Sequence, residues 1–519
     1  MNRGSRCSLT TTGSRPSPCT ASTAPRTVHG EPFLVPKGPA MSAHPADPHR
    51  PAIHLRPPRN WINDPNGLVF HDGHYHVFFQ YNPHGSRHGD IHWGHFRSPG
   101  LITWELLPPA LAPTPGGYDA DGCFSGNAVS DGERLVAFYS AHRDDRWWQP
   151  IAAADSHDGG LSWTKRAELV ISEPPDGTVM WRDPYVWRQN GRWRMLVGAA
   201  LTDGRGAAFM YASDDLDQWT YEGPFLTSAA GVTVDVPDTG WECPQYADFG
   251  AGTGALILSD WHPHDGPRGT LALSGTEGDG RFSAAAPVPL DHGPDLYAPA
   301  LLPAPDGRLL LWGWAWEARD PDWADESGWA GLLTVPRELT LADDGTVHQQ
   351  PARELLALRG PQTLKSTGRG TSHHATDLGQ VGRCFDLTAR LTVTGPQEPV
   401  LRLVTTADDT EHLDIRLDQT NGQLVVDRDR ASLDPRAHGG SYRLPLPDPA
   451  PQPVELRLIV DRSVAELYLS TGQTLTLRFY PTGDAPWRIQ TSGDLEYTVE
   501  AWELSPLTTA ADLAEGEAA

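Results

Sequence analysis

Short apolar stretches, each broken by a turn, recur along the first part of the chain. Five of them share one form, an apolar strand, a glycine-containing turn and a second apolar strand. They cover residues 67–81, 126–140, 183–200, 243–260 and 298–315. Such alternating patterns, with turn residues at the point of reversal, are typical of β-hairpins. The sequence therefore predicts five hairpins between residues 67 and 315.

The turn glycines of these hairpins are regularly spaced. They are Gly73, Gly132, Gly191, a position within 250–254, and Gly307. The first two spacings are both 59 residues, and the next two are roughly 60 and roughly 55. A repeat of this length built from hairpins is typical of propeller blades. We therefore expect a five-bladed β-propeller over residues 51–345, with a long β-sandwich of coincidental spacing as the alternative.

The pattern changes after about residue 345. Residues 346–360 predict a linker with a short helix, because 353–356 contain no glycine or proline. Alternating runs separated by turn residues then continue through residues 361–508. Short strands at regular intervals favour a second all-β domain, a β-sandwich. The alanine- and glutamate-rich residues 509–519 are expected to fray, and the whole protein is expected to be all-β.

Residues 1–50 differ from the rest of the chain. They are rich in serine, threonine, proline and arginine, which is typical of a disordered extension. They also lack the continuous apolar segment of a secretory signal peptide. We therefore expect a cytoplasmic protein, although this pattern does not exclude export.

Composition excludes several classes of partner. The formal net charge of −25 would repel a nucleic acid. No apolar run approaches the roughly 20 residues needed to span a bilayer. The five cysteines include no CxxC pair, which argues against a disulfide framework or a zinc knuckle. The 19 tryptophans suit a sheet core or a surface that stacks against sugar rings.

Three acidic residues occupy similar places in three hairpins. Asp64 lies nine residues before its turn glycine, and Asp183 and Glu242 lie eight before theirs. Because the first strand of each propeller blade lines the central axis, these acids should converge at one end of it. A proline follows each acid within two positions and should stiffen the backbone that presents it.

Clustered carboxylates can divide the work of glycoside hydrolysis. Like charges at close range raise one pKa, so we expect a glutamic acid that donates a proton and an ionised aspartate that acts as nucleophile or charge stabiliser. Strand-entry turns rich in Asp and Asn are the structural alternative. A metal site on the three acids is another, but the adjacent Arg182 argues against a dedicated cation cage.

The motifs around these acids resemble those of glycoside hydrolase family 32, which includes invertases, levanases, inulinases and sucrose-phosphate hydrolases. The similarity extends from about residue 54 to about residue 506. Nine motifs occur in the order expected for the family: WINDPNG (61–67), FFQYNP (78–83), HWGH (92–95), FSG (124–126), WRDP (181–184), WECP (241–244), DLYAP (295–299), WGWAW (312–316) and VPREL (335–339).

The resemblance implies a five-bladed propeller followed by a β-sandwich, and it implies roles for single residues. Asp64 would be the nucleophile, Glu242 the general acid/base and Asp183 the stabiliser of the transition state. The implied substrate-binding residues are Asn63, Gln80, Trp93, Phe124, Ser125, Arg182, Tyr297 and Trp314. The implied reaction is retaining hydrolysis of β-D-fructofuranosides such as sucrose and short fructo-oligosaccharides, without metal or cofactor, by a monomer or homodimer.

The chain departs from the family pattern at one place. Residues 88–90 read His-Gly-Asp where the family usually has Trp-Gly-Asn, so a titratable ring replaces a flat aromatic wall. Two other functions stay open at this point, a fructosyltransferase that uses a sugar as acceptor and a non-catalytic fructan-binding protein. The histidines of HDGHYH (71–76) suit a hairpin better than a zinc site, and Cys243 is expected to be a packed neighbour of Glu242.

Overall fold

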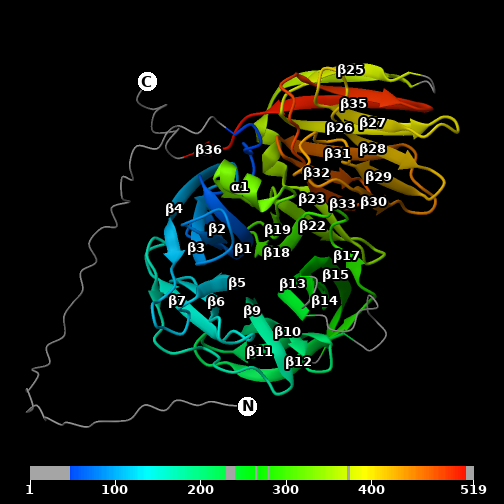
Figure 1. Cartoon of the computed structure of the whole chain (residues 1–519). Helices are drawn as coiled ribbons and strands as arrows, with labels where there is room; N and C mark the ends of the chain where they lie inside the picture. The colour runs from blue at the N-terminus through cyan, green and yellow to red at the C-terminus, as the bar shows by residue number, and fades with distance from the viewer. Residues whose placement is uncertain (1–46, 229–239, 263–265, 279, 371–373, 510–519) are drawn as a thin grey trace, which may run out of the picture. The chain divides into compact units, whose positions relative to one another are not determined.

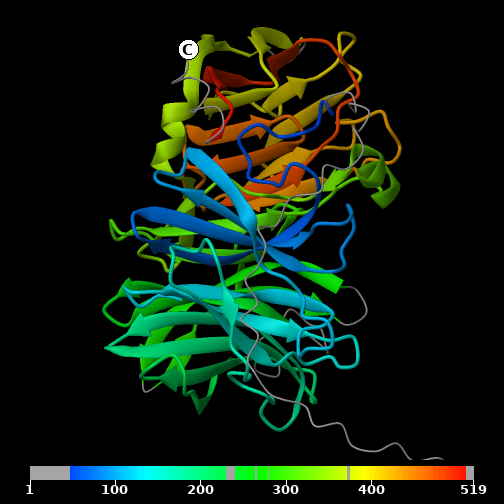
Figure 2. The same cartoon turned by 90° about the vertical axis from the view of Figure 1, so that its left-hand side faces the viewer.

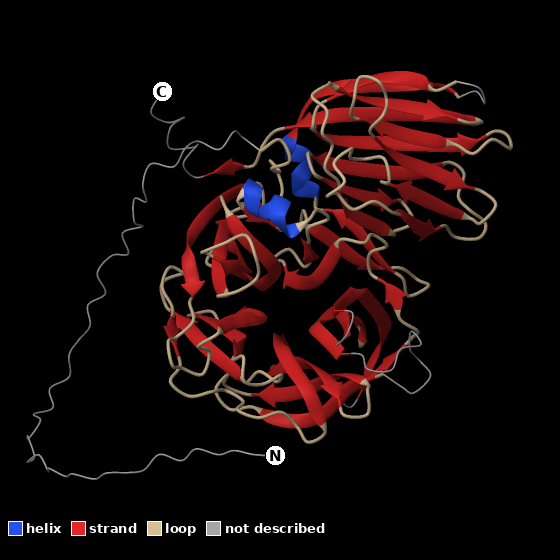
Figure 3. Cartoon of the chain, viewed as in Figure 1, coloured by secondary structure: helices blue, strands red, loops and turns tan. Residues whose placement is uncertain are grey.

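The computed structural model describes residues 47–228, 240–262, 266–278, 280–370 and 374–509. Within these ranges the only helices are α1 (Pro321–Ser327) and the 3-10 helix η1 (Arg353–Leu358) (Figure 3). The all-β prediction is confirmed, and η1 lies where the sequence predicted a short helix. No described helix is long and apolar enough to cross a membrane. Residues 1–46 and 510–519, which contain most of the predicted extension and tail, lie outside the described ranges.

Five sheets form the propeller, and each is built mainly from consecutive antiparallel strands. The first sheet runs β20-β1-β2-β3-β4-β36 and the second β5-β6-β7-β8. Their bounds are β1 Asn60–His71, β2 His74–Asn82, β3 His92–Ser98, β4 Thr103–Leu111, β20 Trp329–Ala330, β36 Thr508–Thr509, β5 Gly122–Ser130, β6 Leu135–His142, β7 Ile151–Ser156 and β8 Thr164–Lys165.

The other three sheets follow the same plan. They run β12-β11-β10-β9, then β13-β14-β15-β16 with β17 beside β15, then β18-β19-β22-β23 with β21 beside β19. Their bounds are β9 Thr178–Gln189, β10 Arg192–Leu201, β11 Gly206–Ser213, β12 Thr220–Thr227, β13 Gly240–Gly250, β14 Thr253–His262, β15 Gly266–Gly278, β16 Arg281–Ala284, β17 Val288–Pro289, β18 Leu296–Pro303, β19 Leu309–Ala315, β21 Leu332–Leu333, β22 Arg337–Leu341 and β23 Val347–Pro351.

The innermost strands β1, β5, β9, β13 and β18 close a ring. Each packs against the next, and β18 packs against β1 (Figure 1). Every predicted hairpin is present, with β1–β2, β5–β6, β9–β10, β13–β14 and β18–β19 paired antiparallel. The turn glycine Gly191, for example, has φ of 83°, a conformation that other residues rarely adopt. The five-bladed propeller predicted from the repeat is therefore confirmed.

Two predicted boundaries need correction. Strand β23 pairs with β22 in the fifth blade, so that blade extends to Pro351 rather than ending at residue 345. The predicted disordered segment 1–50 includes ordered residues at its end, because His49 is buried. The carbonyl of His49 accepts a hydrogen bond of 2.7 Å from Ser463 Oγ. Composition alone could not reveal this contact, since the two residues are far apart in sequence.

The C-terminal strands form a two-sheet sandwich, coloured yellow to red in Figures 1 and 2. The sheets run β24-β35-β26-β31-β32-β33 and β25-β34-β27-β28-β29-β30. Their bounds are β24 Arg359–Arg369, β35 Leu495–Leu504, β26 Cys384–Val393, β31 Val454–Asp461, β32 Val464–Leu469, β33 Thr474–Arg478, β25 Thr376–Val381, β34 Trp487–Ser492, β27 Val400–Val404, β28 His412–Asp418, β29 Gln423–Asp427 and β30 Ser441–Pro445.

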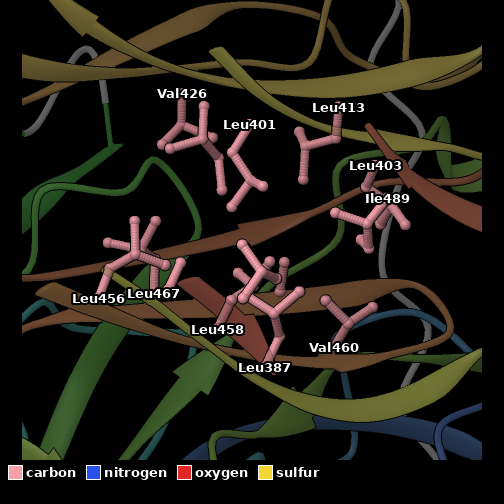
Figure 4. Packing of buried hydrophobic residues seen from close by; sticks show 14 of the residues in the cluster. Leu387, Leu401, Leu403, Leu413, Val426, Leu456, Leu458, Val460, Leu467 and Ile489 are labelled. Carbon is pink, nitrogen blue, oxygen red and sulfur yellow. The ribbon is translucent and has the colours of Figure 1, made fainter. Parts of the chain in front are cut away.

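The sandwich core consists of aliphatic side chains from the two facing sheets. Leu387 and Leu458 on one sheet face Leu401, Leu413 and Ile489 on the other (Figure 4). All five are at most 4% exposed, which fits the alternation of apolar and polar residues along these strands. Burying each such side chain contributes roughly 1.5–3 kcal/mol, so this core stabilises the domain.

Buried charged residues connect the fifth blade to the sandwich. Arg337 of β22 donates to Glu466 of β32 at 2.6 Å and to Asp291 at 2.9 Å. Glu466 also accepts a 2.9 Å hydrogen bond from His54 and a 2.5 Å hydrogen bond from the hydroxyl of Tyr468. Burial would raise the pKa of Glu466, but the charge of Arg337 and these hydrogen bonds outweigh it and lower the pKa to about 2.

We expect Glu466→Ala to lower the free energy of unfolding by about 3–5 kcal/mol, because it leaves Arg337 buried without its main partner. For the wild type, a pKa lowered by folding means that this contribution is present above about pH 4.5 and is lost as the pH falls towards 2. Denaturant unfolding at several pH values measures both effects. Glu455→Ala is the control, because Glu455 pairs with Arg390 at the exposed surface of the same domain. An equally small loss for both variants would contradict the prediction.

Candidate active site

The innermost strand of every blade is irregular at one end. The pairing of β1 with β2 breaks between Ile62 and Pro65, and that of β9 with β10 breaks between Arg182 and Tyr185. Equivalent breaks occur in β5, β13 and β18. An extra residue in a strand bends it and turns a side chain in a new direction. These bulges therefore turn the side chains of residues 63–64, 125, 183, 243 and 298 differently from those of a regular strand.

Three of these positions have positive φ, namely Asp183 at 64°, Cys243 at 47° and Ala298 at 47°. Such conformations are costly for residues other than glycine and cluster at functional sites. The positive φ values also correct the sequence prediction that Asp183 and Glu242 occupy matching positions in their strands. The position in β13 that matches Asp183 is Cys243, and Glu242 comes one residue earlier, in the position of Arg182 in β9.

Cys243 lies between two of the three acids. Its Sγ is 3.7 Å from Asp64 Oδ2 and 3.6 Å from Asp183 Oδ2. Its backbone N–H donates to Asp183 Oδ2 at 3.0 Å. Burial and the three neighbouring carboxylates raise the pKa of the Cys243 thiol well above its usual value, so it stays protonated. The thiol is thus a neutral neighbour of the two aspartates rather than a nucleophile.

Asp64 is held by short hydrogen bonds. Ser125 Oγ donates to Asp64 Oδ2 at 2.5 Å, and Asn63 Nδ2 donates to Oδ1 at 3.1 Å. Asn63 is fixed in turn by the indole N–H of Trp61 at 2.7 Å. Burial and the charge of Glu242 raise the pKa of Asp64, the bond from Ser125 opposes this, and the result is about 6. Asp64 is therefore ionised at neutral pH and oriented on both oxygens.

Asp183 is more deeply buried than Asp64, with 5% of its surface exposed. Its backbone N–H donates to Ser140 Oγ of the neighbouring blade at 2.8 Å. Burial raises the pKa of its carboxyl to about 7, with Arg182 opposing the shift and Glu242 and Asp64 adding to it.

Glu242 has a cation on one oxygen and a hydroxyl on the other. Arg182 donates to Oε1, and Tyr297 Oη donates to Oε2 at 2.6 Å. Burial would lower the pKa of the Arg182 guanidinium, but the charges of Glu242 and Asp183 outweigh burial and raise the pKa of Arg182 above its usual value. Burial raises the pKa of both aspartates, Asp64 and Asp183, which the sequence analysis did not foresee.

Aromatic rings surround the carboxylates. Trp61 lies edge-on to Trp314 at 5.6 Å and to His88 at 6.1 Å, and His88 lies edge-on to Phe124 at 5.6 Å. His88, at the sequence position where the family pattern has tryptophan, thus lies between Trp61 and Phe124. Burial, together with the charges of His142 and Arg182, lowers the pKa of His88, so its ring is neutral at neutral pH.

The segment that carries His88 is fixed by polar contacts. Asn82 Nδ2 donates to the carbonyl of Arg87 at 2.8 Å. The guanidinium of Arg87 donates to Asp322 and Asp325 on α1, both at 2.7 Å. Helix α1 was not expected from the sequence. Its seven residues carry the acids that fix this wall of the site.

Two of the expected substrate-binding residues are enclosed by the propeller core. Trp93 is fully buried, and its indole N–H donates to the carbonyl of Phe124 at 3.1 Å. Gln80 is 1% exposed and donates to the carbonyl of Cys123 at 3.1 Å. Both side chains therefore support the strand that presents Phe124 and Ser125. Sequence motifs could not separate this supporting position from one in contact with a ligand.

Two serines of the site were missed by the sequence analysis. Ser140 and Ser259 lie near the ends of β6 and β14, and each accepts the backbone N–H of a positive-φ residue in the next blade, Asp183 at 2.8 Å and Ala298 at 3.0 Å. Both serines lie near the end of the second strand of a blade, in the sequences YSAH and LSDW. This shared position could have identified them from the sequence.

Among the described residues, one group has ligand atoms close enough to share a metal ion. The group is His84, Asp90 and His92, whose ligand atoms lie within 4.8 Å of one another. His84 Nε2 already pairs with Asp90 Oδ2 at 3.0 Å, and both side chains are at least half exposed. The histidines of HDGHYH (71–76) lie in the β1–β2 hairpin, as expected, and His76 Nδ1 contacts His95 Nε2 at 2.9 Å.

Family models match almost all of the described chain. Residues 54–351 match the Glycosyl hydrolases family 32 N-terminal domain, and residues 354–503 match the Glycosyl hydrolases family 32 C terminal. The chain is 33% identical to raffinose invertase of Escherichia coli over 471 residues, which are 86% of this chain and 92% of that protein. It is 31% identical to sucrose-6-phosphate hydrolase of Zymomonas mobilis over 463 residues, 84% and 88% of the two chains.

Solved structures have the same fold. A Bombyx mori GH32 β-fructofuranosidase aligns with a TM-score of 0.75 and 26% identity, over 89% of this chain and 95% of that one. Fructan 1-exohydrolase IIa of Cichorium intybus aligns with a TM-score of 0.78 and 24% identity, over 89% and 98% of the two chains, which supports the fold alone. The expected resemblance is therefore established over both domains, and the chain belongs to glycosyl hydrolase family 32.

Proposed function

We propose that this chain is a retaining β-fructofuranosidase that releases fructose from sucrose and short fructo-oligosaccharides. The observation that carries the proposal is the meeting of Asp64, Asp183 and Glu242 from three blades around Cys243. A relative at 33% identity is named raffinose invertase, and the Bombyx mori enzyme, at 26% identity, has a mutant structure in complex with sucrose. Both names fit a fructosyl substrate.

In the first step, Asp64 attacks the anomeric carbon of the fructosyl unit. The bond from that carbon to the glycosidic oxygen breaks, and protonated Glu242 donates its proton to the departing oxygen. The product is a covalent fructosyl ester of Asp64 and a free leaving sugar. Ser125 and Asn63 orient the Asp64 carboxylate for this attack.

In the second step, water attacks the same carbon and Glu242 accepts its proton. The ester bond breaks, which frees Asp64 and returns Glu242 to its protonated state. Two displacements at one carbon retain its configuration. Asp183 would stabilise the positive charge that develops on the sugar ring and hold its hydroxyls, while Trp61, His88, Phe124 and Trp314 would enclose the ring.

A panel of sucrose, sucrose phosphate, inulin and levan tests the proposal. We expect reducing sugar from sucrose, with fructose first released in the β configuration, which NMR spectroscopy can follow before mutarotation. Formation of longer fructans as products at high sucrose concentration would instead show that a sugar replaces water as acceptor. Binding of fructans without release of sugar would leave only a binding role and would overturn the proposal.

The pKa of Asp64 predicts the acidic side of the pH profile. Asp64 must be ionised to attack, so kcat/KM should fall as the pH decreases through about 6. Ser125→Ala removes a hydrogen bond that favours the ionised form, so the pKa of Asp64 rises and the acidic limb moves to higher pH. A hydrogen bond to a charged group contributes about 1.5–3 kcal/mol, which corresponds to about one to two pH units.

The control for this measurement is Ser130→Ala. Ser130 lies at the other end of the same strand, β5, where its Oγ contacts His71 Nδ1 at 2.8 Å. This variant should keep the wild-type pH profile. A loss of activity in Ser125→Ala that is equal at every pH would mean that Ser125 acts on something other than the ionisation of Asp64.

A further inference from the structure

A tryptophan at the rim of the propeller is largely exposed. Trp147, between β6 and β7, leaves 64% of its surface exposed. The next residue, Trp148, is only partly exposed and packs under Arg146, whose guanidinium carbon lies 4.7 Å from its ring centroid. Trp148 therefore fills the packing role at this place, and folding does not require a second tryptophan beside it.

The segment that carries Trp147 is anchored at its base. Gln149 N–H donates to the carbonyl of Trp181 at 2.8 Å, and Ala141 N–H donates to the carbonyl of Pro150 at 2.8 Å. Trp148 also forms a parallel bridge with Trp181 of the third blade. These contacts hold the segment against the strand end that carries Arg182. Trp147 is therefore presented from a fixed backbone.

The ring of Trp147 reaches a second tryptophan, two blades away. Its centroid lies 6.0 Å from that of Trp261, at an interplanar angle of 48°. Trp261 lies at the end of β14 and covers Arg182, whose guanidinium carbon is 5.5 Å from the ring centroid. Arg182 contacts Glu242 in turn. The two tryptophans therefore lie on the side of the site that carries Glu242.

The backbone at Trp261 is tied to the same glutamate. Tyr297 Oη contacts the carbonyl of Asp260 at 3.2 Å and donates to Glu242 Oε2 at 2.6 Å. Trp61 and Phe124 lie next to Asp64, because Trp61 contacts Asn63 and Phe124 precedes Ser125, and both Asn63 and Ser125 donate to Asp64. Trp61 and Phe124 thus lie beside the nucleophile Asp64, and the Trp147–Trp261 pair lies beside the acid Glu242.

The position of Trp147 and Trp261 beside Glu242 suggests which ligand they bind. The glycosidic oxygen that Glu242 protonates belongs to the leaving sugar, so that sugar must lie on the Glu242 side. Aromatic faces pack well against the apolar C–H faces of pyranose rings. We propose that Trp147 and Trp261 form a binding site for the leaving sugars of an oligosaccharide, with Trp147 contacting the unit farther from the cleaved bond. The inference rests on the proposed function.

Three β-fructofuranosides with different leaving groups test this site. Raffinose leaves a galactosyl-glucose, sucrose leaves glucose, and methyl β-D-fructofuranoside leaves methanol. We expect Trp147→Ala to lower kcat/KM for raffinose about two- to thirteenfold, which corresponds to the roughly 0.5–1.5 kcal/mol of an aromatic pair. The loss should be smaller for sucrose, and the methyl fructoside should be unaffected because it has no sugar to reach Trp147.

Matched variants make the result specific. Trp147→Phe keeps an aromatic face and should recover most of the raffinose activity. Tyr221→Ala removes another exposed aromatic residue, on the outer strand of the third blade, and should change no substrate. Thermal unfolding should be the same for the wild type and both Trp147 variants. An equal loss for all three substrates, or no loss for raffinose, overturns the leaving-sugar site. Failure of the wild type to cleave any of the three overturns the proposed function instead.

Discussion

Asp64→Ala should lower kcat by several orders of magnitude for every fructoside. Asp183 cannot take the place of Asp64, because it is more buried and is fixed by the backbone N–H of Cys243. Fold stability should be little changed, since Asp64 makes no ion pair in the structure's described part and its hydrogen bonds come from Ser125, Asn63 and Cys243. Initial rates on sucrose, with a melting curve for each protein, measure both effects.

A small anion can separate the role of nucleophile from other roles. In Asp64→Ala, azide could occupy the space of the carboxylate and attack the anomeric carbon while Glu242 protonates the leaving oxygen. A single displacement would give a fructosyl azide of inverted configuration. Asp72→Ala, at the exposed turn of the same hairpin, is the matched control and should keep wild-type kcat. Near-normal sucrose cleavage by Asp64→Ala would remove the assignment.

The fold could be predicted because its information is local and repeated. Each hairpin carries its own alternation and its own turn glycine, and the constant spacing from Gly73 to Gly132 and Gly191 reveals the blades. The domain boundaries were harder to predict from the sequence. Strand β23 belongs to the fifth blade because it pairs with β22, and nothing in its five residues distinguishes that strand from a linker.

The candidate site was predicted in part. Proline-flanked acids at strand starts indicated which residues would meet, and the structure brings Asp64, Asp183 and Glu242 together. The electrostatics were not predictable, because the raised pKa values of Asp64 and Asp183 depend on burial and on contacts between blades. The bulges that make Cys243, rather than Glu242, the counterpart of Asp183 are also set by pairing between strands.

Contacts between distant segments account for the remaining differences. Trp93 belongs to a motif but lies in the propeller core, whereas Trp147 belongs to no motif and lies exposed at the rim. Helix α1 supports the segment of His88 through Arg87, 235 residues before Asp322 in the chain. Such pairs have no signature in a single sequence, because each residue alone is compatible with an ordinary surface or core position.

Glu242→Ala should produce a loss that depends on the leaving group. General acid catalysis contributes about 10²–10⁴-fold, so sucrose cleavage should fall by about that factor because glucose departs poorly without a proton. A fructoside with an acidic phenol as leaving group needs little protonation, so its first step should stay close to the wild-type rate. The second step still lacks its base, so the fructosyl ester of Asp64 should accumulate after a burst of released phenol.

The variant also leaves Arg182 without its partner in a largely enclosed site, which would reduce stability. Glu242→Gln keeps the shape and a hydrogen bond to Arg182, so it should show the same dependence on the leaving group with less loss of stability. Glu133→Ala, in an exposed turn of the second blade, is the surface control. A loss equal for sucrose and the phenyl fructoside, with no burst, would show that Glu242 is not the proton donor. The acid would then have to be sought elsewhere around the leaving sugar.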